Sequence, residues 1–288
     1  MTSGREHALA AASLVGGIAL SAVIVGGGVT LAGDVVAKVP VATQSAWIGD
    51  ALFNLVIFAP LAIIAMIAAR LCGVRALAMG AQPGAMLALG AGLGVGGVLA
   101  AAGYAALAGA ITPGAFADAG GLLLAGLAVV TVQAGAEEIA FRGWMQPVIA
   151  RAWGPAAAIG LTALSFAGLH VMGGARAPVT LLNLALGGVL FGLLAWRGQG
   201  VAGALGAHIV WNATEQLVLG LDPNPGAGSF GTIWDLDLTG AALWGGSEEG
   251  LNAGIGMTFA LVAILAALLM LWVPRRKDAP VAVTAPAT

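Results

Sequence analysis

The sequence predicts an all-α protein, a polytopic transmembrane bundle of about eight membrane-spanning helices. Of its 288 residues, 60% are hydrophobic and only 8% are charged, whereas an ordinary soluble domain has roughly 25% charged residues. Apolar runs of about 20 residues, long enough to cross a bilayer as a helix, recur along the whole chain. Short polar segments separate them and leave no room for a soluble domain of usual size. We therefore expect a single transmembrane domain over residues 1–277 and a disordered tail over residues 278–288.

Each expected span is an apolar run bounded by polar residues. The first run is longer than the roughly 7–15 residues of a signal-peptide core, so we expect it to be a retained anchor. The third is rich in glycine and alanine, which lets helices approach closely in lipid. In chain order the expected spans are about Ala8–Ala32, Trp47–Arg70, Gly84–Ala110, Gly121–Ala150, Trp153–Met172, Pro178–Trp196, Gly200–Leu219 and Ala253–Val273.

The basic residues predict the orientation, because lysine and arginine in short loops are retained on the cytoplasmic side. With eight spans, Lys38 and Arg176 fall on one side, and a larger set falls on the other. The loop Asp222–Gly250 is acidic and has no lysine or arginine. We therefore expect both termini to be cytoplasmic and this loop to lie on the opposite side. The cytoplasmic set is Arg5, Arg70, Arg75, Arg151, Arg197, Arg275, Arg276 and Lys277.

Charge and cysteine content exclude several kinds of function. The formal net charge is −2, and no basic face exists that could bind nucleic acid. Cys72 is the single cysteine, so an intramolecular disulfide and a cysteine-built metal site are both excluded. The lipid bilayer is the expected main solvent of the protein.

Polar side chains inside the expected spans mark the candidate site. Glu137, Glu138 and Arg142 lie within six residues of the fourth span, although each ionisable group at bilayer depth costs roughly 2.5–3.5 kcal/mol on insertion scales. At about 1.5 Å rise per residue, Glu137, His170 and His208 lie roughly 21, 25 and 16 Å from the cytoplasmic ends of their spans. These similar depths allow one shared site. The other polar residues of the late spans are Asn183, Asn212 and Glu215.

Helical spacing separates the roles of these residues. Glu138 and Arg142 are four residues apart and can pair on one helix face, whereas Glu137 points about 100° away. His208 and Asn212 also share a face. Glu215 lies on roughly the same face, where it either orients His208 or contacts a helix interface. Asn183 is expected to be a hydrogen-bonded bridge between helices.

Two chemistries fit this set of side chains. A carboxylate that polarises water, a histidine that shares the proton and donors for an oxyanion are the parts needed to hydrolyse an amide. Glu137, His170 and His208 are also a ligand set for catalytic zinc, as in a metalloprotease, although the helical H-E-x-x-H motif is absent. The residues alone leave open whether a metal cofactor is used.

The motifs resemble those of the CPBP family of intramembrane proteases, which includes the CAAX prenyl proteases and bacteriocin-immunity proteins. The resemblance rests on Glu137-Glu138-x-x-x-Arg142, Phe166-x-x-x-His170 and His208-x-x-x-Asn212, and it places a protease-like core at about residues 121–220. It implies that Glu137 activates water together with His170. It also implies that Glu138 and Arg142 hold the site together, and that His208 and Asn212 bind the oxyanion. All six are candidate catalytic residues.

The leading functional prediction is an intramembrane endopeptidase. Its partner would be a membrane protein or peptide, with a lipidated CAAX-type C-terminal tail as one substrate class implied by the resemblance. A transporter or proton relay is the first alternative, because buried glutamate, histidine and arginine also mark ion pathways. A non-catalytic immunity or assembly protein is the second.

Overall fold

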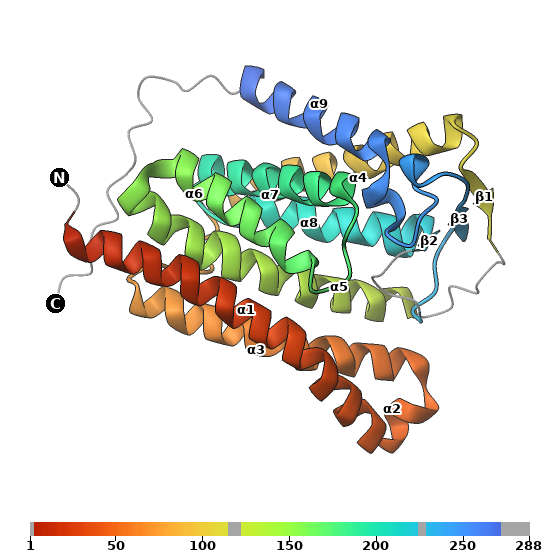
Figure 1. Cartoon of the computed structure of the whole chain (residues 1–288), viewed down its shortest axis with the longest axis horizontal. Helices are drawn as coiled ribbons and strands as arrows, with labels where there is room; N and C mark the ends of the chain where they lie inside the picture. Colours follow the sequence, from red (N-terminus) through yellow and green to blue (C-terminus); the bar gives the residue numbers. More distant parts are fainter. Residues whose placement is uncertain (1–2, 115–121, 224–228, 272–288) are drawn as a thin grey trace.

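The protein folds as a bundle of long helices with a small sheet at one end (Figure 1). A computed structural model describes residues 3–114, 122–223 and 229–271. The expected all-α membrane bundle is confirmed. The main helices are α1 Gly4–Lys38, α3 Ala46–Leu71, α4 Pro83–Leu107, α5 Leu123–Glu138, α6 Gln146–His170, α7 Pro178–Gly198, α8 Ala202–Ala213 and α9 Ile255–Leu271, and the short α2 spans Pro40–Gln44.

The number of membrane crossings agrees only approximately with the expected eight. Five helical stretches of the described residues are long and apolar enough to cross a membrane, and one of them is Leu123–His170. That stretch reverses direction at Gly154, which has φ 82° and ψ 165°. The rings of Phe141 and Phe166 lie 5.5 Å apart, whereas a straight helix would separate these residues by about 37 Å. It therefore contains two expected spans. Helices α8 and α9, with 12 and 17 residues, are shorter than any of the five stretches.

Helices α4 and α8 pack with their backbones in close contact. A Cβ atom on Gly90 would fall 2.0 Å from the carbonyl oxygen of Gly203, and one on Gly94 would fall 2.6 Å from that of Ala207. Only glycine permits this approach, as is common between helices in lipid. The glycine-rich third span is thus a packing surface, as predicted, and it sets the position of α8, which carries His208.

The N-terminal run packs into the bundle as α1, against α3 and α6. A Cβ atom on Gly17 would fall 2.6 Å from the sulfur of Met145, so this glycine lets α1 approach the α5–α6 unit. At the other end of α1, the Trp153 indole donates a 2.9 Å hydrogen bond to His7 Nδ1. This run therefore builds one wall of the core.

A small sheet, which the sequence analysis did not predict, lies at one end of the helical bundle. Strands β1 Ile111–Pro113, β3 Leu236–Leu238 and β2 Leu221–Asp222 form a sheet in that order, with β1 antiparallel and β2 parallel to β3. The third span accordingly ends at Leu107 rather than Ala110. The strands satisfy one another's backbone N–H and C=O groups, and the side chains of Leu221 and Leu238 are buried. The acidic loop is thus an ordered cap at this end of the bundle over its described residues.

Candidate active site

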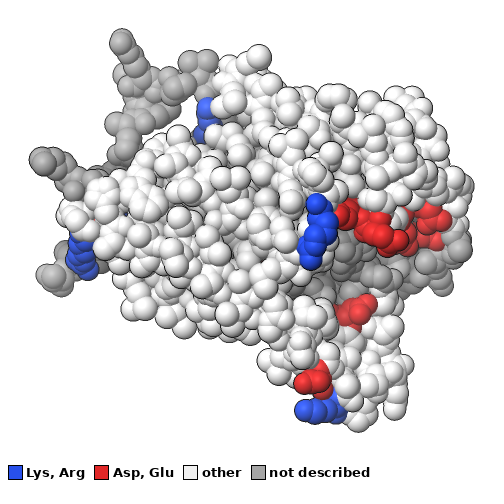
Figure 2. All heavy atoms as spheres, in the orientation of Figure 1, with Lys and Arg blue, Asp and Glu red and all other residues white. Residues whose placement is uncertain are grey.

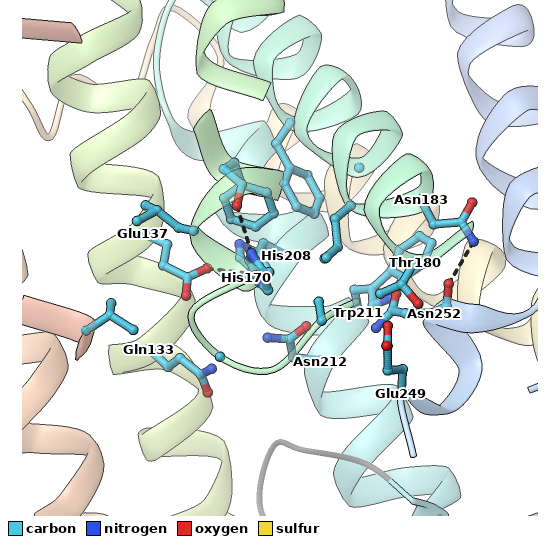
Figure 3. A pocket seen from close by; sticks show the side chains of 18 of the residues that line it. Gln133, Glu137, His170, Thr180, Asn183, His208, Trp211, Asn212, Glu249 and Asn252 are labelled. Atoms are coloured by element: carbon cyan, nitrogen blue, oxygen red, sulfur yellow. Dashed lines mark hydrogen bonds and ion pairs between the residues drawn. The ribbon is translucent and has the colours of Figure 1, made fainter. Parts of the chain in front are cut away.

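A cavity of about 540 Å³ opens among α1, α3, α5, α6, α7 and α8. Glu137, His170, His208 and Asn212 all line it, and Figure 3 shows them around the same space. Their similar depths in the sequence predicted this meeting. Whether they act as catalytic residues stays a prediction.

His208 connects the two adjacent glutamates. Its Nδ1 lies 2.8 Å from Glu138 Oε1, and its Nε2 lies 3.6 Å from Glu137 Oε2. An ionised carboxylate only accepts hydrogen bonds, so we assign the proton of Nδ1 to the bond with Glu138. The distance to Glu137 is long for a direct hydrogen bond and suits a bridging water. The imidazole is only 5% exposed, so both of its polar partners come from the protein interior.

Glu138 and Arg142 form a buried ion pair behind the cavity, as the i, i+4 spacing predicted. The distance from Arg142 Nη1 to Glu138 Oε1 is 3.0 Å, and both side chains are fully buried. Arg142 Nη2 donates a 3.0 Å hydrogen bond to the carbonyl of Gly188 on α7. Neither Glu138 nor Arg142 lines the cavity. The pair therefore joins α5, α7 and α8 through His208 rather than facing a substrate.

Aromatic rings enclose the polar groups. His208 stacks on Phe191, with ring centroids 4.7 Å apart and an angle of 15°. The Arg142 guanidinium lies 4.9 Å from the centre of the Phe166 ring, a distance typical of a cation–π contact. These rings exclude water from the Glu138–Arg142 pair, and a low local dielectric strengthens each of its polar contacts.

The segments that carry the motifs are partly π-helical, whereas the spacing argument assumed regular α-helices. The turns Ile139–Met145 and Thr214–Leu219 are π-helices. A π-helical turn contains an extra residue and is frequent at functional sites. The wider turn changes which faces the later residues present, so Glu215 could not be placed from α-helical spacing alone.

His170 is the last residue of α6. Its Nδ1 lies 2.8 Å from the carbonyl oxygen of Phe166, and its ring centroid lies 4.6 Å from that of Phe166. A backbone bond at Nδ1 fixes the ring, so Nε2 is the nitrogen left for chemistry. Among the described residues, no three His, Cys, Asp or Glu side chains are grouped closely enough to hold a metal ion. Glu137, His170 and His208 therefore do not form a ready zinc site.

Several cavity residues were not predicted to belong to the site. Gln133 lines the cavity one helical turn before Glu137, and its i, i−4 spacing could have identified it. Glu215 is 6% exposed and also lines the cavity, but Glu138 rather than Glu215 orients His208. Asn183 donates to the carbonyls of Asn252 and Gly254 at 2.8 and 3.1 Å. Its side-chain oxygen also accepts a 2.7 Å hydrogen bond from the Thr258 hydroxyl of α9, which confirms the prediction that Asn183 bridges helices.

The mouth of the cavity lies at the acidic end of the bundle. Glu248, Glu249 and Asn252 of the acidic loop line it, as does the turn Gly173–Ala175 after α6. Glu249 accepts hydrogen bonds from the backbone N–H groups of Arg176 and Ala177 at 2.8 and 2.9 Å, which ties the loop to the start of α7. Figure 3 shows Glu249 beside Thr180.

The charge of Glu249 is favoured at this position. Partial burial by itself would raise the pKa of Glu249, but hydrogen bonds from Thr180, Ala177 and Arg176, together with the positive charge of Arg176, outweigh it. The pKa of Glu249 therefore lies below its ordinary value. The loop is fastened by an ionised carboxylate at neutral pH.

Comparison with known proteins agrees with the motifs. Residues 119–214 match the family model described as type II CAAX prenyl endopeptidase Rce1-like. Neither a curated protein nor a solved structure matches the chain. The matched residues include all six candidate residues and the helices that position them. Over these residues the chain is therefore similar to CAAX-type prenyl endopeptidases.

Proposed function

We propose that this protein is an intramembrane endopeptidase in which Glu137 activates a water molecule to hydrolyse a peptide bond of a membrane-associated protein or peptide. The observation that supports this most directly is the division between the two adjacent glutamates. Glu137 faces the cavity beside His208 Nε2, whereas Glu138 is buried against Arg142 and the other ring nitrogen. One carboxylate is available to water, and the other is held by fixed partners.

In the proposed reaction, Glu137 accepts a proton from water, and the resulting hydroxide attacks the carbonyl carbon of the scissile bond. Asn212 and protonated His208 donate hydrogen bonds to the oxyanion that forms. With the Nδ1 proton of His208 donated to Glu138, the Nε2 atom donates to the oxyanion only when both ring nitrogens carry a proton. Glu137 then returns this proton to the leaving amine, directly or through His170, as the C–N bond breaks. This sequence balances without a further reactant.

Zinc remains an additional proposal and not a step in this mechanism. Glu137, His170 and His208 have the right donor chemistry, but the described residues present no ready cluster of three ligands. If zinc binds, these three residues would hold it and it would supply a more acidic water. Metal content of the purified protein, compared between wild type and His170→Ala, tests this independently of activity.

The position of the cavity favours a protease over a transporter or proton relay. Its lining includes loop residues of the acidic end, Gly173 and Glu248 among them, and none of the described residues at the basic end of the bundle. A cavity lined by loop residues of one end only suits a protease, whereas a transporter or proton relay needs a path to both faces. A lipidated CAAX-type tail remains one proposed substrate class, as does an unmodified membrane peptide.

The test compares membrane peptides from cells that express wild type and Glu137→Gln, using mass spectrometry. Glutamine keeps the shape and removes the base, so cleavage products should fall by roughly 10²–10⁴-fold while protein yield is retained. The purified variants should show the same loss on any substrate so identified. Equal product levels from both proteins would exclude this enzyme mechanism and favour the immunity or assembly role.

A further inference from the structure

Four carboxylates and no lysine or arginine line the cavity, as far as the described residues go. Glu137 and Glu215 lie deeper, and Glu248 and Glu249 lie at the mouth. The two histidines of the lining, His170 and His208, are the only side chains there that can carry positive charge. Glu138 already balances Arg142 behind the cavity, so at most two positive charges oppose the four glutamates of the lining. The cavity therefore offers a negative field to whatever enters.

The surroundings of the mouth extend this field. Figure 2 shows acidic side chains gathered at the end of the molecule that carries the sheet in Figure 1. The basic residue nearest the mouth in sequence is Arg176, and its guanidinium binds the carbonyl oxygens of Val171 and Ala175. Arg176 is thus committed to the turn after α6 and does not line the cavity.

Glu248 and Glu249 differ although they are neighbours. Glu249 is held by backbone N–H groups at the start of α7. Glu248 is exposed, and no hydrogen bond or ion pair joins it to another of the described residues. Its carboxylate is therefore free to pair with a charge on an incoming chain.

We infer that the cavity takes a peptide segment bearing lysine or arginine near the scissile bond, that this segment enters from the acidic end, and that Glu248 is a specificity-determining residue. This inference rests on the proposed function, because it names the substrate class of the same cavity. A negative lining attracts a cationic chain and repels an anionic one. Among the described residues, the lining likewise presents no lysine or arginine to a free C-terminal carboxylate.

The test uses synthetic peptides that share one apolar segment and differ only in flanking charge. Three amidated peptides carry lysine, glutamine or glutamate beside the segment, and a fourth is the glutamine peptide with a free C-terminal carboxylate. Cleavage is measured as kcat/KM with the full-length wild type in detergent. Binding is measured by fluorescence anisotropy with the full-length Glu137→Gln variant, so that affinity is read without turnover.

The lysine peptide should bind on the order of fivefold more tightly than the glutamate peptide, as expected for one exposed ion pair, and added salt should reduce this preference. Glu248→Gln should weaken the preference, and Glu248→Lys should reverse it. The matched control is Asp237→Asn, which removes an acidic-loop charge that does not line the cavity. It should leave the preference unchanged.

The outcomes separate the inference from the proposed function. Cleavage without a charge preference, or with a preference for the glutamate or free-carboxylate peptide, would overturn the inference. The proposed protease function would then still stand. If binding is charge-selective and this selectivity is lost in Glu248→Gln, but wild type cleaves no peptide, the proposed protease function would be overturned. The inferred charge preference of the cavity would then still stand. Absence of both binding and cleavage would overturn both.

Discussion

At the scale of single residues, the protein gives two adjacent glutamates opposite environments. Glu138 is fully buried and accepts from both Arg142 and His208 through the same oxygen, Oε1. Glu137 faces the cavity, and its Oε2 atom lies 3.6 Å from His208 Nε2. A one-residue step along a helix rotates a side chain by about 100°, which is enough to separate a structural carboxylate from an accessible one.

We predict that Glu138→Gln destabilises the protein by about 3–5 kcal/mol, because it leaves the buried Arg142 guanidinium without its counter-ion. Thermal unfolding of the purified protein measures this. Glu137→Gln is the matched control and should unfold near the wild-type temperature. If Glu137→Gln were the unstable variant and Glu138→Gln were stable but inactive, the two assignments would have to be exchanged.

We predict that Glu249→Gln removes an acid-sensitive part of the stability. Because the pKa of Glu249 is lowered in the folded protein, its charge stabilises the fold above the ordinary value of 4.5. This contribution declines as the pH falls below 4.5 and is absent once the pH is below the lowered pKa. The difference in unfolding temperature between wild type and Glu249→Gln should therefore be largest at neutral pH and vanish in acid.

The control for this pH series is Glu248→Gln, which changes the neighbouring exposed carboxylate. It should follow the wild-type curve at every pH. A difference between wild type and Glu249→Gln that persisted unchanged into acid would mean that the side-chain shape, and not its charge, fastens the loop to α7.

At the scale of elements, close packing of α4 on α8 positions the histidine of the site. Gly90 contacts Gly203, five residues before His208. We predict that Gly90→Ala destabilises the protein by at least the roughly 1–3 kcal/mol of an overpacked interior and lowers activity by displacing α8. Unfolding temperature and cleavage rate measure the two effects.

Gly92 offers a matched control on the same helix, since a Cβ atom there would meet nothing within 4 Å. Gly92→Ala should be neutral, or stabilising by up to about 1 kcal/mol, because alanine is the better helix former. Equal effects of the two substitutions would show that α4 and α8 are not held at this distance in the membrane.

At the scale of the whole molecule, the distribution of charge predicts the orientation in the membrane. The loops at one end collect most of the arginines, and the opposite end carries the acidic loop and the mouth of the cavity. By the rule that basic loops stay in the cytoplasm, the cavity opens on the non-cytoplasmic side. This orientation remains a prediction.

Reporter fusions test the orientation directly. A reporter at Thr288 should report the cytoplasmic side, and one inserted at Gly228 should report the opposite side. Thr288 and Gly228 both lie outside the described residues, and Gly228 belongs to the acidic loop. A reporter at either position therefore disturbs no described helix. Reports from the same side would require an even number of crossings between the two positions and a revised orientation of the cavity.

The sequence by itself determined the membrane bundle, the Glu138–Arg142 pair and the set of residues that meet in the cavity. These follow from local properties: hydropathy along the chain, and the helical period within one segment. The same local rules placed the reversal of the Leu123–His170 stretch between Ala150 and Trp153, close to the observed turn at Gly154.

Only the tertiary structure decided which carboxylate holds His208, because Glu138 and His208 are 70 residues apart and their meeting depends on how α5 and α8 are rotated. The same is true of the π-helical turns, the three-stranded sheet and the attachment of Glu249 to α7. Each depends on contacts between segments that are distant in the chain. The distances between their atoms are set by how the helices rotate and cross relative to one another, and no local sequence pattern encodes that arrangement.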